Sequence, residues 1–431
     1  MQNFRWRRLS WDLTTGLLFL PGVIIGALGA LALFLVEFEQ HFPLPGLARL
    51  LGVEPAAAQV VLGTVAGSMI TVVTSVYSIL LVALSLASMQ FSTRIVIGYL
   101  RDRVSQLALG ACIGTFAFSL IVLRTVRTGD DAFVPPVAMS LAPVLALSAL
   151  AVVVYFIHHV ALGIQANHIV DRIAGETEHV IDAVFPSSSA PRVAPLSPPS
   201  AVGADAVAVT AVGSGYIQLV DMAGLSALAG EGLTIHLMRA MGAFVAVGAP
   251  LFSVSPSSAL TSARRAQLLA CIDLGPVRTM QDDAEYGFRQ IVDIALKALS
   301  PAVNDPSTAA TCLDHLGRLL IRVAARSGPV DHVVVGAGRV TVPTTSMVLL
   351  VDLAFEQIRQ YAKGDLAVSL RLLRVIADVA AVTGDTVVLA TLAAHATRVE
   401  HTIRAGFADE QLDEMERRLE AVRAAVTVHR A

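Results

Sequence analysis

The sequence is poor in charged residues. Only 15% of its 431 residues are Asp, Glu, Lys or Arg, whereas 55% are hydrophobic and the mean hydropathy is +0.68. An ordinary soluble domain has about a quarter of its residues charged, so this composition predicts a membrane protein. The formal net charge of −3 indicates no basic surface, and we expect no nucleic-acid partner.

Cysteines and catalytic motifs are also scarce. Cys112, Cys271 and Cys312 are far apart and share no CxxC spacing, which argues against a zinc site or a disulfide framework. His168 and Asp171 have an i,i+3 spacing that suits a metal, but solvent-facing histidines are the commoner interpretation. The sequence contains no GxxxxGK[ST], HExxH, GxSxG or kinase-like pattern. We therefore expect no enzyme, no catalytic residues, no metal site and no cofactor.

Four apolar segments reach the length of about 20 residues that a bilayer requires. They run roughly over Gly16–Val36, Val60–Phe91, Gln106–Val126 and Val134–His158. No cleavage site follows the first segment, so we interpret it as a retained span and not as a signal peptide. None of the four has Asp, Glu, Lys or Arg in its central portion. This disfavours a proton-coupled carrier, because such carriers place ionisable groups at the membrane midplane.

The loops between these segments predict an orientation. Basic residues lie before the first segment and between the second and third, at Arg5, Arg7, Arg8, Arg94, Arg101 and Arg103. Acidic residues lie in the other two loops, at Glu37, Glu39, Glu54, Asp130 and Asp131. The positive-inside tendency then predicts a bacterial inner-membrane protein with both termini in the cytoplasm. The outer acids would concentrate cations at the mouth of a pore.

The rest of the chain predicts a cytoplasmic α+β region. The expected divisions are a four-helix transmembrane domain at 1–160, an amphipathic helical extension at 161–185, a Pro/Ser linker at 186–204, a small β subdomain at 205–256 and a mainly helical domain at 257–431. The segment GAFVAVGAPLFSV is similar to half of a lipoyl- or biotinyl-type barrel. Because no lysine lies in that region, we expect a small β-barrel-like subdomain without the carrier function. We also expect a hairpin at 332–342, and a last helix that packs on its own domain or, alternatively, forms a seam between subunits.

The second span carries its hydroxyl side chains on one side. At 100° per residue, the ten serines and threonines from Thr64 to Thr93 fall within an arc of about 160°. Such a stripe arises most often where helices pack closely and bond across the contact. Alternatively the stripe lines water and offers oxygen ligands to a passing ion, or it forms part of a substrate cleft. The pore-lining residues of the second hypothesis are Thr71, Thr74, Ser75, Ser78, Ser85 and Ser88.

Small residues in two other spans predict close packing within one subunit. Gly22, Gly26 and Ala30 have four-residue spacing in the first span, and Gly110 and Gly114 have it in the third. If these faces serve packing inside the subunit, the hydroxyl face of the second span is free to meet symmetry-related copies.

The densest polar cluster outside the spans is QDDAEYGFRQIVDIALKALSPAVNDPSTAATCLDHLGRLL at 281–320. Arg289 and Asp293 lie four residues apart on one helix face. Residues 304–306 (Asn-Asp-Pro) predict a turn, after which Ser307 or Thr308 caps the next helix. Such a helical hairpin is usually structural. The alternative is a ligand or ion site that gates the membrane part, formed by Arg289, Asp293, Asn304 and Asp305.

Three segments together resemble one family. SMITVVTSVYSILLVALSLASMQFSTR, YLRDRVSQLALGACIGTFAFSLIVLRTV and RTMQDDAEYGFRQIVDIALKALSPAVNDPSTAATCLDHL are similar to the bacterial predicted membrane proteins catalogued as domain of unknown function 2254. The likeness covers nearly the whole chain, although Ser85 replaces a Gln and Thr93 a Pro of the family's pattern. The resemblance implies a membrane protein with a cytoplasmic domain, and it implies no activity, cofactor or catalytic residue.

The sequence therefore predicts a homo-oligomeric, four-span membrane protein with a cytoplasmic region. Our hypothesis is an ion channel or small-solute pore, lined by the hydroxyl face of the second helix and gated by the cytoplasmic domain. Its partners would be the bilayer, further copies of the chain, ions and a small cytoplasmic ligand. The alternative is a non-conducting membrane-tethered scaffold or sensor, in which the stripe is a packing seam.

Overall fold

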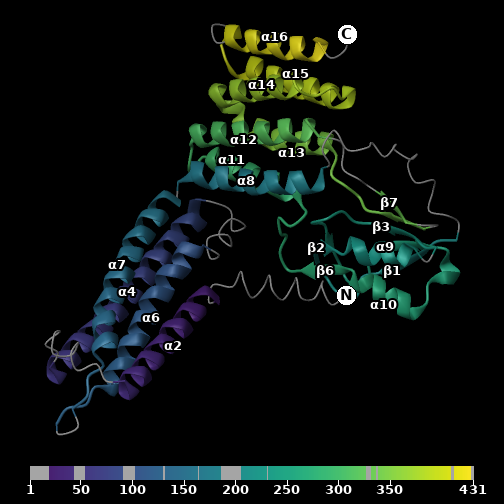
Figure 1. The fold of residues 1–431 in the computed structure, drawn as a ribbon. Helices are drawn as coiled ribbons and strands as arrows, with labels where there is room; N and C mark the ends of the chain where they lie inside the picture. The colour runs from purple at the N-terminus through teal and green to yellow at the C-terminus, as the bar shows by residue number, and fades with distance from the viewer. Residues whose placement is uncertain are drawn as a thin grey trace. The chain divides into compact units, whose positions relative to one another are not determined.

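The computed structural model describes ten stretches of the chain (Figure 1). They are residues 19–42, 54–90, 102–129, 132–163, 165–185, 205–230, 232–326, 332–335, 338–408 and 412–428. The chain forms two compact units, residues 1–165 and 166–431, and each is considered by itself. Several residues used in the predictions lie outside the described ones: Arg5, Arg7, Arg8, Arg94, Arg101, Asp130, Asp131 and the linker at 186–204.

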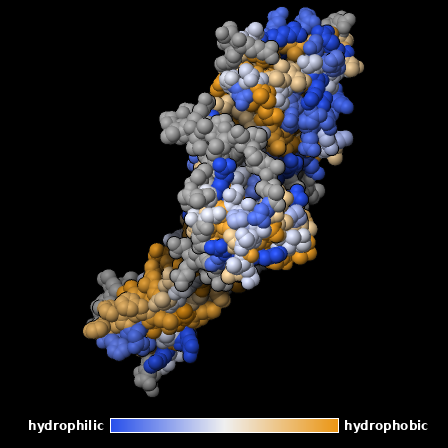
Figure 2. Space-filling model, turned by 90° about the vertical axis from the view of Figure 1, so that its right-hand side faces the viewer, coloured by the Kyte–Doolittle hydropathy of each residue, from blue (hydrophilic) through white to orange (hydrophobic). Residues whose placement is uncertain are grey.

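The first unit contains four long apolar helices in its described part. They are α2 (Phe19–His41), α4 (Pro55–Gln90), α6 (Arg103–Thr125) and α7 (Pro136–Gly163). Each is long and apolar enough to cross a membrane, which confirms the four expected spans. Hydrophobic residues cover most of the face of this unit seen in Figure 2. With 36 residues, α4 is about 54 Å long and exceeds the bilayer core of about 30 Å, so it must tilt or protrude.

Helix α6 is the centre of the first unit and packs against α2, α4 and α7. In its most apolar stretch of 18 residues, 56% of the residues are buried, against 22% in that of α4. The reason is the absence of side chains at two positions. A Cβ at Gly110 would lie 2.8 Å from Ile24 Cδ1, and one at Gly114 would lie 2.7 Å from Leu28 Cδ1. The predicted packing face on the third span is therefore confirmed, and α2 fills it.

The predicted packing face on the first span is wrong. A Cβ added at Gly22 or Gly26 of α2 would meet nothing within 4 Å, and Ala30 is exposed. Helix α2 contacts α6 through its bulky Ile24 and Leu28 instead. Four-residue spacing identified a face free of bulky side chains, but in α2 the apolar side opposite that face makes the contact.

The helices of the second unit form a layered stack (Figure 1). They are α8 (Ala166–Val184), α11 (Ala284–Ala298), α12 (Pro306–Ala324), α13 (Met347–Tyr361), α14 (Leu366–Ala380), α15 (Thr386–Gly406) and α16 (Leu412–Val428). Helix α8 covers α11 and α12. From there α11, α13 and α15 pack in one row, and α12, α14 and α16 in another. This is the arrangement of stacked helical hairpins. The apolar side of α16 is buried within the unit, as predicted.

Eight described strands make two sheets. They are β1 (Val207–Thr210), β2 (Gly215–Val220), β3 (Thr234–Leu237), β4 (Phe244–Val245), β5 (Pro250–Ser255), β6 (Ile272–Gly275), β7 (His332–Val335) and β8 (Gly338–Thr341). One sheet has the order β1-β5-β3-β8-β7 and the other β4-β2-β6. Two short helices, α9 (Met222–Gly230) and α10 (Ser262–Ala270), pack with them.

The barrel-like form expected for 205–256 is not confirmed, because the described strands make two open sheets. The expected hairpin is present as β7 and β8, and β8 pairs in parallel with β3. Strand β3 therefore pairs with β5 on one side and with β8 on the other, so no strand of 205–256 can pair with that second edge to close a barrel. Gly338 permits this, since a Cβ there would lie 1.9 Å from the Ala229 carbonyl oxygen. A hairpin almost 80 residues downstream therefore completes the sheet.

Candidate functional site

The hydroxyl face of α4 is open in a single subunit. Five of the six predicted pore-lining residues have exposed side chains: Thr71, Thr74, Ser75, Ser78 and Ser85. For Ser88 the structure describes the helical backbone and not the side chain. The opposite side of α4 supplies Met69, Val76, Leu80 and Ala83 to the core formed with α6 and α7. Glycines continue the open face toward the start of the helix, because a Cβ at Gly63 or Gly67 would meet nothing within 4 Å.

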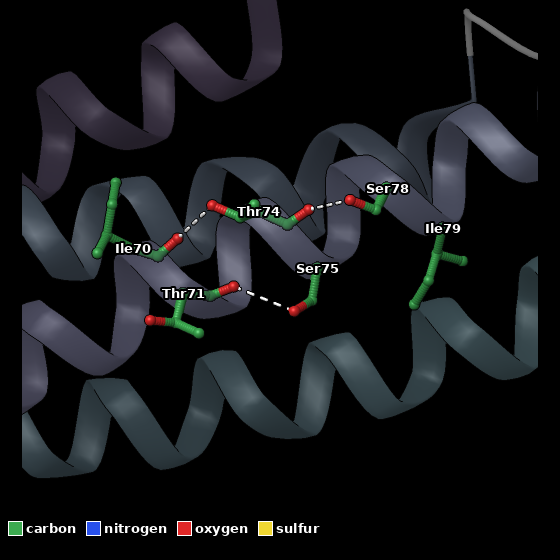
Figure 3. Close-up of a pocket in the computed structure, with 6 residues that line it drawn as sticks. All are labelled: Ile70, Thr71, Thr74, Ser75, Ser78 and Ile79. Atoms are coloured by element: carbon green, nitrogen blue, oxygen red, sulfur yellow. Dashed lines mark hydrogen bonds between the residues drawn. The ribbon is translucent and has the colours of Figure 1, made fainter.

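A hollow of 490 Å³ runs along this face (Figure 3). Its lining is Ile70, Thr71, Thr74, Ser75, Ser78 and Ile79, all from α4. Four residues with hydroxyl groups lie between two isoleucines along one helix, without a charged group among the six. A surface of this kind presents neutral oxygen atoms beside apolar side chains.

Each of these hydroxyls forms a hydrogen bond within its own helix. Thr74 Oγ1 donates to the Ile70 carbonyl at 3.0 Å, and Ser78 Oγ donates to the Thr74 carbonyl at 2.9 Å. The same bond joins Ser75 Oγ to the Thr71 carbonyl at 3.1 Å. The protons are thereby occupied, while the oxygen lone pairs stay available to a cation, water or another helix. The hydroxyl groups on this face therefore have hydrogen-bond acceptors without a contribution from another helix of the subunit.

The acids predicted for an outer mouth have different environments. Glu39 is only 1% exposed, and its two carboxylate oxygens each accept a backbone N–H of α7, from Val137 and Ala138, at 3.0 Å. It takes the place of an N-cap side chain, because the residue before α7 is Pro135, whose side chain has no oxygen to accept these N–H groups. Glu37 is exposed and pairs with His41 at 3.4 Å. The expectation that Glu39 attracts cations at a mouth is therefore wrong.

The predicted ligand cluster in the second unit is spread along a helix and a turn. Arg289 and Asp293 lie in α11, and Arg289 Nη2 is 3.7 Å from Glu285. Asn304 and Asp305 follow that helix, whose last residue, Ala298, lies nine positions after Arg289, a rise of about 14 Å.

The turn itself has a structural role. Asp305 caps α12 by accepting the backbone N–H of Thr308 at 3.1 Å and its hydroxyl at 2.6 Å. The predicted cap at Ser307 or Thr308 is wrong, because Pro306 occupies the first helical position and the preceding carboxylate reaches the free N–H groups. Asn304 has a φ of 48°, a conformation that Asn tolerates in tight turns. These hydrogen bonds lower the pKa of Asp305.

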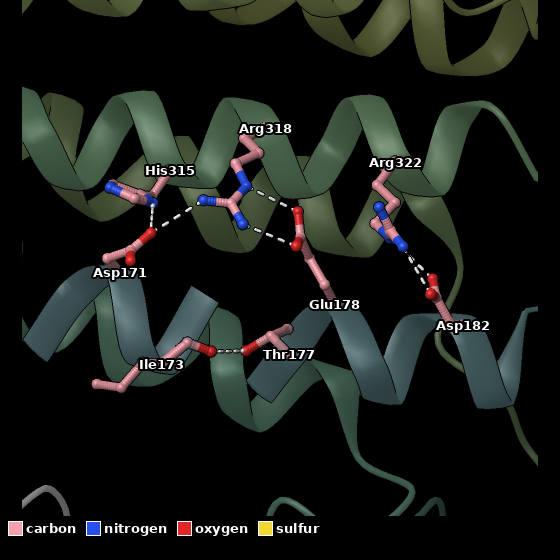
Figure 4. A network of polar contacts seen from close by, with 8 residues as sticks. All are labelled: Asp171, Ile173, Thr177, Glu178, Asp182, His315, Arg318 and Arg322. Atoms are coloured by element: carbon pink, nitrogen blue, oxygen red, sulfur yellow. Dashed lines mark hydrogen bonds and ion pairs between the residues drawn. The ribbon is translucent and has the colours of Figure 1, made fainter. Parts of the chain in front are cut away.

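A network between α8 and α12 was missed in the sequence (Figure 4). Arg318 donates to Glu178 at 2.7 Å and to Asp171 at 3.1 Å, and one helical turn later Arg322 donates to Asp182 at 2.6 Å. The signal was present as acids and arginines at helical spacing. Nothing in the sequence says which arginines face which acids, since about 140 residues separate them.

The same network explains Asp171, for which a metal spacing with His168 was considered. Its carboxylate is 4.0 Å from His315 Nδ1 in addition to its bond with Arg318. Hydrogen bonds from the arginines lower the pKa values of Glu178 and Asp182. In the described part of the chain, no three His, Cys, Asp or Glu side chains lie together as metal ligands do.

These observations define a class of protein: a membrane protein with four apolar helices, followed by an α+β unit with two small sheets and a helical stack. Contact with a lipid bilayer follows from that class. The chain belongs to the family described as predicted membrane protein (DUF2254), whose sequence profile matches residues 14–378. The predicted resemblance is confirmed. The match ends within α14, so α15 and α16 lie beyond it.

Mycobacterial relatives support the same assignment. Uncharacterized protein Mb1321c of Mycobacterium bovis and uncharacterized protein Rv1290c of Mycobacterium tuberculosis are each 34% identical to this chain over 336 residues. The matched region is 76% of this chain and 64% of each relative, so the chain covers less than two thirds of their length. No solved structure matches the chain.

Proposed function

We propose that the protein is a homo-oligomeric ion channel or small-solute pore of the bacterial inner membrane. In the assembly, the α4 helices surround the symmetry axis and their hydroxyl faces line the pathway. Both chain termini are cytoplasmic, and the second unit gates the pore. The proposal assigns no catalytic role and no cofactor. The observation that carries it is the exposed, internally hydrogen-bonded hydroxyl face of α4.

The chemistry of that face suits passive conduction. Neutral oxygens replace part of an ion's hydration shell without holding the ion tightly, so it can leave again. Helix α4 contains no Asp, Glu, Lys or Arg along its 36 residues. A coupled carrier would need ionisable groups at the midplane. The open hollow between Ile70 and Ile79 gives one subunit's share of such a pathway.

The proposal that the second unit gates the pore rests on the short connection in the chain between α7 and α8. Helix α7 ends at Gly163, and α8, the first layer of the helical stack, begins at Ala166. Helix α8 is held to α12 by the Arg318 and Arg322 pairs. A small cytoplasmic ligand that shifts the stack would therefore displace the helix attached to the last span. Arg289, Asp293, Asn304 and Asp305 remain the proposed ligand residues.

The second candidate is a non-conducting scaffold or sensor. Gly63 and Gly67 favour it, because they continue the open face of α4 with the four-residue spacing of close helix contacts. In that arrangement the hydroxyls would be buried between copies of α4, and no continuous pathway would remain.

Planar-bilayer recording of the purified full chain separates the two candidates. We expect conductance in the native protein and its loss in the double variant Ser75→Leu/Ser78→Leu, because two leucines fill the hollow with apolar side chains. The matched control is Ser148→Leu on α7. Ser148 is also exposed and donates to its own helix, at the Val144 carbonyl at 2.8 Å. This variant should conduct like the native protein.

Cross-linking supplies the independent measurement. Ser75→Cys should form disulfide-linked copies in membranes if α4 helices meet around an axis, and Ser148→Cys should not. Cross-linked copies without conductance under varied ions, voltage and pH would favour the scaffold. Conductance that survives Ser75→Leu/Ser78→Leu would reject α4 as the lining.

A further inference from the structure

The β part of the second unit exposes an apolar ribbon, defined here as residues 211–216 paired with 244–249. Strands β2 and β4 pair Tyr216 with Phe244, whose rings lie 5.3 Å apart. Beyond the strands, Ser214 Oγ accepts the backbone N–H of Val247 at 2.8 Å, and Gly248 N–H donates to the Ala211 carbonyl at 2.8 Å. The ribbon is therefore a fixed antiparallel structure and not a pair of loose loops.

The ribbon leaves three large apolar side chains in the open. Val212 is 75% exposed, Val247 is 64% exposed and Phe244 is 58% exposed. All three lie within two short segments that are bonded to each other. Single exposed apolar residues are normal on a protein surface, but three on one short ribbon indicate a contact surface.

Charge tells what kind of partner fits. Neither Ala206–Val220 nor Ala240–Ala263 contains an Asp, Glu, Lys or Arg. Elsewhere in this unit the helices are joined by pairs such as Arg318–Glu178 and Arg371–Asp314. A charged residue would oppose insertion into lipid, whereas a protein partner usually meets a polar rim. The two segments of the ribbon carry no charge of their own, and charged side chains beside them have partners: Arg265 donates to Thr210 Oγ1 at 3.0 Å, and Arg278 donates to Asp283 at 2.6 Å. The aromatic rings of Tyr216 and Phe244 are of the kind that lies at the bilayer interface.

A bilayer is also within reach of this unit. The chain has four helices apolar enough to span one, and only residues 164–165 separate the last of them from α8. A covalent tether raises the local concentration of lipid around the ribbon, so a shallow contact by few side chains suffices.

We propose that this ribbon inserts Val212, Phe244 and Val247 into the interfacial layer of the bilayer that holds the spans. The second unit then has two attachments to the membrane, one covalent through α7 and one reversible through the ribbon. The proposal does not depend on conduction, and it holds equally for a pore or a scaffold.

Lipid quenching of a label at Val247 tests the insertion. The native thiols Cys112, Cys271 and Cys312 are buried, and burial raises the pKa of Cys271 to about 11, so an added exposed cysteine is labelled selectively. The full chain with Val247→Cys is labelled with bimane and placed in nanodiscs, with or without lipid that carries a doxyl group near the top of its acyl chain. We expect the doxyl lipid to lower the fluorescence by about twofold or more.

The matched control is Val387→Cys on α15, where the native side chain is 63% exposed, nearly as much as Val247. Its label should keep its fluorescence in doxyl lipid. Adding Phe244→Asp to Val247→Cys should abolish the quenching while circular dichroism stays unchanged. Val212→Asp replaces it if that variant fails to fold. Equal quenching at positions 247 and 387, or disulfide-linked dimers of Val247→Cys without quenching, would overturn the proposal.

Discussion

Helices α4 and α6 lie side by side and both carry glycines at four-residue spacing, yet their glycine faces have different environments. In α6, Ile24 and Leu28 of α2 fill the space beside Gly110 and Gly114. In α4, the space beside Gly63 and Gly67 is open. The filled face joins α2 to α6, whereas no described segment packs on the glycines of α4.

Helix α8 adds a second contrast with α4. Both have polar residues on one side, but the carboxylates of α8 face Arg318 and Arg322, while the hydroxyls of α4 bond to their own helix. A buried or half-buried carboxylate requires a partner, because its charge is costly to desolvate. A serine or threonine in a helix satisfies its proton locally. The hydroxyls of α4 therefore keep their hydrogen bonds without a partner from another segment, whereas the carboxylates of α8 have arginine partners.

The largest expected effect distinguishes the filled face from the open one. Gly110→Leu should destabilise the first unit by about 3 kcal/mol or more, because even a Cβ there approaches the backbone at Pro21 Cα to 3.0 Å. Gly67→Leu, the matched variant on α4, should leave the free energy of unfolding of the isolated subunit nearly unchanged. Unfolding by sodium dodecyl sulfate measures both. Equal losses would mean that the α4 face is filled as well.

A smaller effect is expected at the capping carboxylate. Glu39→Ala leaves the N–H groups of Val137 and Ala138 without an acceptor, which should cost about 1–3 kcal/mol. Glu37→Ala removes an exposed acid of the same helix and should change the stability by less than about 0.5 kcal/mol. Thermal unfolding in detergent compares the two. Similar shifts would show that the cap is not formed.

The contacts of α8 predict a pH dependence. Because bonds from Arg318 and Arg322 lower the pKa values of Glu178 and Asp182 in the folded protein, the unfolded chain binds more protons as the pH falls. Stabilisation by these pairs is present above about pH 5 and is lost below it, by about 0.5–1 kcal/mol for each partly exposed pair. Arg318→Gln should flatten the acid limb of stability measured by chemical denaturation. An unchanged slope would contradict this assignment.

The smallest expected effect is a gain in the stability of the subunit. Gly63→Ala places a methyl group in open space and restricts the unfolded chain, so it should stabilise the subunit by about 0.5 kcal/mol. If copies of α4 pack closely at this position, the same variant should weaken the assembly. Subunit stability and the mass of the complex in detergent are therefore measured on the same sample. A loss of subunit stability would place Gly63 in a filled contact.

Much of the fold could be predicted from the sequence. The four spans, the hairpin at 332–342 and the family were correct, because each is encoded in a local pattern of apolar residues, turn residues or motif letters. The wrong predictions are those that concern which segment of the chain packs against a given residue or bonds to it. The open face of Gly22 and Gly26, the cap at Asp305 and the role of Glu39 all depend on which segment lies opposite.

For the candidate site too, one part could be predicted from the sequence and another could not. The one-sided placement of Thr71, Ser75 and Ser78 follows from helical geometry, and the sequence alone determined it. That this side is open, while the side of Val76 and Leu80 is buried, was decided only by the tertiary structure. A residue's position on a helix depends on its number in the chain. Burial depends on which distant segments pack against it, and here those are α6 and α7.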